Sequence, residues 1–77
     1  MKQNELQDKF KNNLIEVMRA RGFSQNRLAR VSGLASSRIN DYVNGRAVPT
    51  VYAVTNIAYA LGTTPGKLID FNERIHK

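Results

Sequence analysis

Several hydrogen-bonding side chains recur at helical spacing in the middle of the chain. At about 100° per residue, one helical arc contains five of them: Ser36, Ser37, Asn40, Asp41 and Asn44. A hydroxyl can donate or accept a hydrogen bond, an asparagine amide can pair bidentately with adenine, and an aspartate can accept from the amino group of cytosine. These side-chain types within one short arc predict a helix that reads base edges in a major groove.

Three of these positions have a second interpretation. Ser36 and Ser37 stand at the expected start of the helix, where their hydroxyls can instead cap its free N–H groups. Asp41 lies three residues after Arg38, so an ion pair between the two competes evenly with a base contact. Arg38 flanks the arc, and from there it can reach either a phosphate or a base edge.

Arginine is concentrated in the same part of the chain. The formal net charge is +6, from twelve Lys and Arg against six Asp and Glu. Residues 19–46 hold six arginines, no lysine and a single acid, Asp41, so this window carries six minus one, or +5, of the total. A guanidinium binds phosphate bidentately, and clustered positive charge favours a polyanionic partner. The alternative is a solvated basic face that has no partner.

The residues around the polar arc predict two short helices joined by a tight turn. Ala29 is small where two steeply crossed helices bring their backbones together. Gly33 follows four residues later, where it can end the first helix in the left-handed region. The second helix is expected to pack two apolar side chains against two of the first, Ile39 and Tyr42 against Leu28 and Val31. This spacing indicates a helix-turn-helix, with an ordinary helical hairpin as the alternative.

Glycines mark the ends of successive helical stretches, at Gly22, Gly33, Gly45 and Gly62. The sequence therefore predicts an all-α fold of five helices, since no stretch shows the alternation of a strand. The expected helices cover residues 5–21, 25–32, 36–43, 51–61 and a last stretch from residue 65. Ser24 and Thr50 are expected to cap the second and fourth helices, and the helix-turn-helix is formed by the second and third.

Apolar side chains form a stripe on each of the longer helices. The first helix is expected to direct inward Leu6, Phe10, Leu14, Val17 and Met18. On the fourth, the expected stripe is Val51, Val54, Ile57, Ala58 and Leu61. Tyr52 and Tyr59 share a face beside it and are expected at the edge of the core rather than on a partner surface. Near the end of the chain, a further stripe that packs on the first helix or on a second subunit is formed by Leu68, Phe71 and Ile75.

Length and composition limit the remaining options. A chain of 77 residues is expected to form a single domain over residues 1–77. No apolar run approaches the roughly 20 residues that span a bilayer, and the polar start lacks a signal-peptide core, so we expect a cytoplasmic protein with no membrane partner. With no cysteine, disulfides and thiolate metal sites are excluded.

Catalytic chemistry has little support. His76 is the only histidine, and the sequence contains no cysteine, no carboxylate pair and no phosphate-binding glycine loop. We therefore expect no enzyme activity, no cofactor, no metal site and no small-molecule ligand.

Several short motifs resemble the phage repressor and Cro type of helix-turn-helix domain. They are R-G-F-S-Q from Arg21, L-A from Leu28, G-L from Gly33, N-G-R from Asn44, P-T from Pro49 and A-L-G-T-T-P from Ala60. The resemblance covers about residues 10–69 and leaves 70–77 as a C-terminal extension. It implies a compact, lambda-repressor-like DNA-binding domain of five helices, sequence-specific operator binding and usually a dimer.

The resemblance also bears on individual residues. Gln25 opens the second helix, where its amide and the free N–H groups of the helix end can meet a phosphate. Asn44 and Arg46 match positions that contact phosphate in the family, although Arg46 can also be a solvated loop charge. Many relatives join the first and third helices by an arginine and a glutamate at the positions of Met18 and Val43. Here both residues are apolar, and we expect their side chains to touch.

These patterns predict a sequence-specific transcriptional regulator, most simply a repressor. It is expected to bind a two-fold operator in double-stranded DNA as a homodimer, through the major groove. An antitoxin-type autoregulator or a restriction-modification controller that also binds a protein partner is the alternative, since its sequence would look nearly the same. RNA binding is less favoured, because the basic window lacks the aromatic platforms that stack on single-stranded bases.

Overall fold

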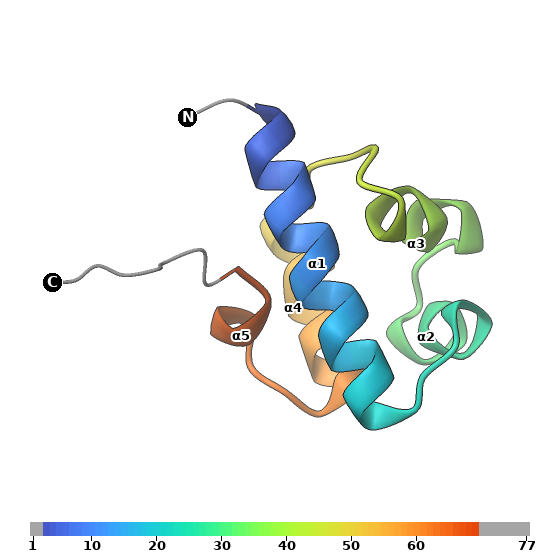
Figure 1. The fold of residues 1–77 in the computed structure, drawn as a ribbon. Helices are drawn as coiled ribbons and strands as arrows, with labels where there is room; N and C mark the ends of the chain where they lie inside the picture. Colours follow the sequence, from blue (N-terminus) through green and yellow to red (C-terminus); the bar gives the residue numbers. More distant parts are fainter. Residues whose placement is uncertain (1–2, 70–77) are drawn as a thin grey trace, which may run out of the picture.

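The structure is a computed structural model that describes residues 3–69, with side chains from residue 5 onward. Its helices are α1 (Gln3–Arg21), α2 (Gln25–Ser32), α3 (Ser36–Val43), α4 (Val51–Leu61) and α5 (Pro65–Ile69). Within these residues there are five helices and no strand, which confirms the all-α prediction. Figure 1 shows α1 lying against α4 in the centre, with α2 and α3 on one side and α5 on the other. None of the helices in this range is both long and apolar enough to cross a membrane.

The helix boundaries agree closely with those expected from the sequence. Ser24 Oγ accepts a hydrogen bond from the Arg27 N–H, and Thr50 Oγ1 accepts one from the Ala53 N–H, each at 3.1 Å. Such caps each stabilise a helix by about 1 kcal/mol. The start of α1 differs from the prediction, because the helix begins at Gln3 and so includes Asn4. Asparagine is only mildly unfavourable inside a helix, so it does not force an end there.

All five helices contribute buried side chains to the core. Phe10, Leu14 and Met18 occur every fourth residue along α1, and all three are buried. The ring of Phe10 packs edge-to-face on that of Tyr42, with 5.6 Å between centroids, and this contact joins α1 to α3. The other large buried side chains are Leu28, Ile39, Ile57, Leu61 and Leu68.

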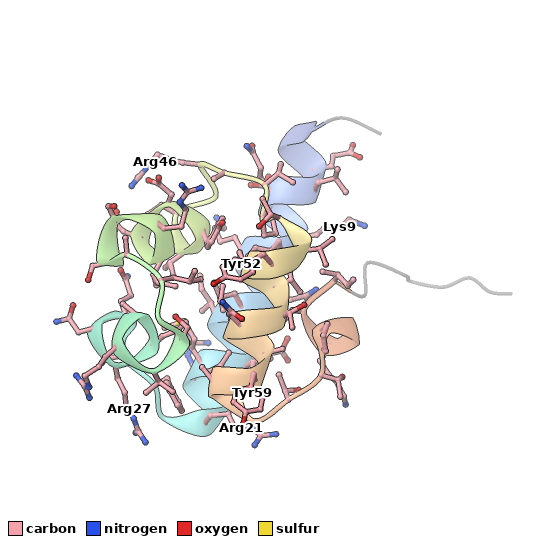
Figure 2. The ribbon with its side chains drawn as sticks, turned by 180° about the vertical axis from the view of Figure 1, so that it is seen from behind. Lys9, Arg21, Arg27, Arg46, Tyr52 and Tyr59 are labelled. Carbon is pink, nitrogen blue, oxygen red and sulfur yellow. The ribbon has the colours of Figure 1, made fainter. Side chains whose placement is uncertain are left out.

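Four residues that periodicity assigned to the core or its edge are exposed. Their exposed fractions are 51% for Val31, 85% for Val51, 70% for Tyr52 and 88% for Tyr59. Figure 2 shows both tyrosines on the outer side of α4. For the three residues on α4 the prediction was wrong because this helix is apolar around most of its circumference, so periodicity alone did not select the buried arc. Ala53, which is 3% exposed, belongs to that arc instead of Val51. On α2 the buried residues are Leu28 and Ala29, and Val31 lies about 200° around the helix from Ala29.

Two contacts expected for α1 can be compared with the structure. Met18 is buried, Val43 is half-buried against the core, and both line one small hollow together with Phe23. Neither residue is fully exposed to solvent, and direct contact between the two side chains stays a prediction. Near the middle of α1, Asn13 Nδ2 donates a hydrogen bond to the Leu68 carbonyl at 2.9 Å, so α5 is joined to α1. Phe71 and Ile75, the rest of the expected C-terminal stripe, lie outside the described residues.

Candidate nucleic-acid interface

A glycine turn sets the angle between α2 and α3. Gly33 has φ of 76°, and its N–H donates to the Ala29 carbonyl at 3.0 Å. Ser32 Oγ then accepts from the Leu34 N–H at 3.3 Å, which satisfies the first donor after the turn. Ala29 is 6% exposed, so it occupies the close approach of the two helices for which a small residue was expected. The predicted helix-turn-helix geometry is confirmed.

The two faces of α3 differ in burial. Ile39 and Tyr42 are 0% and 1% exposed, so one face of the helix is fixed in the core. The opposite face carries the polar residues that the sequence singled out. The exposed ones are Ser36, Ser37, Arg38 and Asn44, and the half-buried ones are Asn40 and Asp41. A helix eight residues long with one buried face and one polar face can enter a major groove without unfolding.

The serines at the start of α3 are not used as caps. Ala35 is the N-cap residue, and it makes no side-chain cap hydrogen bond. Among the described side chains, the hydroxyls of Ser36 and Ser37 have no hydrogen-bond partner. The structure therefore does not contain the capping alternative, and both hydroxyls are available to a ligand.

Four of the expected site residues form one hydrogen-bonded network. Asn40 Nδ2 donates to Gln25 Oε1 at 3.1 Å, which links α3 to the start of α2. Asn40 Oδ1 accepts from Arg46 Nη2 at 2.6 Å. Arg46 also donates from Nε to Asp41 Oδ1 at 3.1 Å, and its Nη2 lies 3.1 Å from the same oxygen. The network therefore runs from Gln25 through Asn40 to the ion pair of Arg46 with Asp41.

The partner of Asp41 differs from the one expected. Asp41 pairs with Arg46 rather than with Arg38, which makes no ion pair with any described side chain. Gly45 adopts φ of 71° after the helix, so the chain turns back. The Arg46 N–H then donates to the Asp41 carbonyl at 2.8 Å. Helical spacing favoured Arg38, but the left-handed turn brings Arg46 closer.

Gly45 is also held close to α1. A Cβ at this position would lie 3.3 Å from Lys11 Cδ and 3.5 Å from Asp8 Oδ1. Since its φ is also positive, a larger residue would be strained in two ways. Gly45 therefore positions Arg46, a role that sequence reasoning missed although the glycine had been recognised as a stop signal.

Asn44 caps the C-terminal end of α3 through its own side chain. Its Nδ2 donates to the Asn40 carbonyl at 2.8 Å, and its backbone N–H donates to the same oxygen at 3.0 Å. One donor of the side-chain amide is thus used locally, and the rest of the exposed amide faces outward. Asn44 therefore remains a candidate DNA contact, and it also stabilises the end of α3.

Arg27 was not assigned a role from the sequence. Its guanidinium carbon lies 4.3 Å above the centroid of the Phe23 ring, a cation–π contact that orients the side chain in the first turn of α2. The signal in the sequence was the spacing of four residues between Phe23 and Arg27. Figure 2 shows Arg27 and Arg46 at opposite ends of the side formed by α2 and α3. The two arginines flank the polar face of the motif.

The arginine-rich window keeps its positive charge in the folded chain. All six of its arginines are exposed. Only Arg46 forms an ion pair with a described side chain, and the others do not: Arg19, Arg21, Arg27, Arg30 and Arg38. Their unpaired guanidinium groups create a positive field around the helix-turn-helix that attracts polyanions.

Comparison with known proteins agrees with this geometry. Residues 13–74 match the model of the Cro/C1-type HTH DNA-binding domain. Among solved structures, the chain is similar to the restriction-modification controller protein C.AhdI from Aeromonas hydrophila, with a TM-score of 0.74 and 33% sequence identity over 78% of this chain and 91% of that chain. The comparison with curated proteins gave no match. The chain therefore belongs to the Cro/C1-type helix-turn-helix family and is a DNA-binding transcriptional regulator.

Proposed function

We propose that this protein is a repressor that binds a two-fold operator in double-stranded DNA as a homodimer. In each half-site α3 lies in the major groove, and the bound dimer blocks access of polymerase to the promoter. The observation that carries this proposal is the division of α3 into a buried face, with Ile39 fully buried, and an opposite face of hydrogen-bonding side chains.

The proposed contacts fall into two groups. Bases are read by Ser36 and Ser37 at the start of α3 and by Asn40 in its middle. Phosphates are bound by Gln25 at the start of α2 and by Arg46 after α3, since these residues flank the reading helix on both sides. The remaining members of the proposed site are Arg38, Asp41 and Asn44.

An apolar groove beside α5 supports the dimer. Its volume is about 350 Å³, and it is lined by Leu6, Val48, Pro49, Val51, Val54, Thr55, Pro65 and Ile69. Val51 and Ile69 are 85% and 45% exposed, so much apolar surface faces solvent here. We place the contact with a second copy of this chain in this groove. A two-fold operator needs two reading heads, and a contact between two copies in this groove would supply them.

A controller of a restriction-modification system is the second candidate. The specific observation in its favour is the 33% identity to C.AhdI, which is itself such a controller. An antitoxin-type autoregulator that also binds a protein partner is compatible with the same fold. Both kinds of autoregulator would bind the promoter of their own gene, so a footprint on that promoter separates them from a repressor of distant genes.

Selection of duplexes from a random pool tests the proposed function. Bound duplexes should converge on two related half-sites about one helical turn apart, and affinity should fall steeply as salt rises from 50 to 200 mM, by roughly 10³-fold or more for six phosphate contacts. Bound duplexes with no common sequence would contradict sequence-specific reading. A single unrepeated half-site would contradict the dimer alone.

A further inference from the structure

We propose that Asp41 is a positioning residue in the DNA-binding face. It holds the Arg46 guanidinium in place so that one nitrogen, Nη1, faces a DNA phosphate, and it does not itself read a base. This inference rests on the proposed DNA binding through α3, and it goes further by assigning distinct duties to Asp41, the only acid in residues 19–46, and to Arg46, the arginine that pairs with it.

The hydrogen bonds of Arg46 account for two of its three nitrogens. A guanidinium carries five N–H groups, one on Nε and two on each Nη. Nε donates to Asp41 Oδ1, and Nη2 donates to Asn40 Oδ1 at 2.6 Å and lies 3.1 Å from Asp41 Oδ1. Among the described residues, Nη1 has no hydrogen-bond acceptor. A phosphate can therefore bind at Nη1 while every other contact of the group is kept.

The backbone and a second helix support the same arrangement. The Arg46 N–H donates to the Asp41 carbonyl at 2.8 Å, so main chain and side chain of Arg46 are both joined to one residue of α3. Asn40, the other acceptor for Arg46, is in turn bonded to Gln25 at the start of α2. Since the guanidinium is ordered before DNA arrives, less rotamer entropy is lost on binding.

The ion pair also neutralises the negative charge of Asp41, which would otherwise disfavour DNA binding. Asp41 is the only acid in residues 19–46, and its side chain is 43% exposed on the face that meets DNA. An unpaired carboxylate there would repel phosphates, whereas the ion pair cancels its charge. Ion pairs at such exposed positions stabilise a fold by only about 0–1 kcal/mol, so the consequence of the pair is expected in DNA binding rather than in folding.

A double-mutant cycle on the selected duplex tests the proposal. In the native background, Asp41→Asn should lower affinity by about tenfold, because the guanidinium loses its anchor. In the Arg46→Ala background the same change should leave affinity unchanged or raise it, because it removes an unpaired charge. The two effects should therefore differ by more than about threefold, as coupled neighbours do. A difference of threefold or less would overturn the proposal.

Arg38→Ala supplies the matched control for the cycle. Arg38 is an exposed arginine on α3, the helix that carries Asp41, and it forms no ion pair with any described side chain. The effect of Asp41→Asn should be the same in this background as in the native protein, within about twofold. Equal coupling to Arg38 and Arg46 would show a general charge effect and would overturn a specific positioning role.

Two further readouts separate positioning from base reading and from failure of the proposed function. Asp41→Asn should weaken all duplexes alike, whereas loss of preference at one base pair would make Asp41 a cytosine reader and overturn the inference. In the free protein, the NMR signal of Arg46 Nε–H should be protected from solvent exchange and lose protection in Asp41→Asn. Native protein that selects no duplex would refute the proposed function, while native selection with an uncoupled cycle would refute this inference alone.

Discussion

Asn40 on α3 donates a hydrogen bond to Gln25 on α2, with 3.1 Å between Nδ2 and Oε1. The two helices of the motif are thus joined on their polar side, in addition to the core contacts of Leu28 and Ile39 on the other. This link couples a residue proposed to read a base to a residue proposed to bind a phosphate. Substitutions at either position therefore affect the orientation of the other.

Gln25→Ala removes both a phosphate contact and the partner of Asn40. Affinity should fall for every duplex through loss of the phosphate contact. It should fall most for the duplex with the base pair that Asn40 prefers, because the Asn40 amide loses one of its two side-chain partners. The free energy of unfolding should change by no more than about 1 kcal/mol, since the bond is only partly buried. Competition binding with single-base variants of the operator measures both effects. An unchanged base preference would show that Asn40 does not depend on Gln25 for its contact with DNA.

Ser37→Ala removes an exposed hydroxyl that has no partner among the described side chains. We expect unchanged thermal stability and a shift in preference at one operator position of roughly 1–3 kcal/mol. Asn12→Ala, which changes an exposed polar residue of α1, is the control and should leave base preference intact. Equal effects of the two substitutions would argue against base reading at the start of α3.

Gly45→Ala forces a Cβ into a left-handed turn that already lies against Lys11. The substitution should destabilise the fold by about 1–2 kcal/mol. It should also weaken DNA binding, because the turn can no longer bring Arg46 back to Asp41.

Gly66→Ala is the matched control. This glycine lies in α5 and has no positive φ, and a Cβ there meets only Thr64 Oγ1, at 4.0 Å. The control should leave DNA binding unchanged, and its stability should stay level or rise by up to about 1 kcal/mol. Chemical denaturation and operator titration would show whether the two glycines differ in this way.

Val51→Asp places a carboxylate in the apolar groove proposed as the dimer contact. The dissociation constant of the dimer should rise at least about tenfold, because burying a charge without a partner is costly. Tyr59→Asp changes an equally exposed residue of the same helix, 88% against 85% exposed, that does not line the groove. Sedimentation velocity should show monomers for the first variant and native behaviour for the second. A native protein that stays monomeric at all concentrations, or equal effects of both variants, would contradict a dimer contact in this groove.

Local sequence signals were sufficient to predict the helix ends and the outward face of the helix-turn-helix. The left-handed glycine at Gly33 and the capping hydroxyl of Ser24 depend on neighbours within four residues, so both could be predicted without tertiary information. The register of α3 followed in the same way, since Ile39, Tyr42 and Val43 are the apolar residues of an otherwise polar helix. These features determine which side chains face outward.

Contacts that depend on turns between helices or on packing between them could not be predicted from the sequence. The pairing of Asp41 with Arg46 depends on a left-handed residue between them, and helix spacing rules do not extend past the end of a helix. On α4, apolar residues cover most of the circumference, so the choice of buried arc was made by packing against α1, α2 and α5. Tyr52 and Tyr59 were misassigned for that reason.

The most direct test of the central claim, that α3 reads a DNA sequence, is the ratio of two affinities measured at one salt concentration. The selected operator is compared with a duplex of the same composition in scrambled order. We expect a ratio of at least about 10³ in favour of the operator. Equal affinities for the two duplexes would mean that the protein binds DNA only through charge, and the role assigned to the polar face of α3 would be wrong.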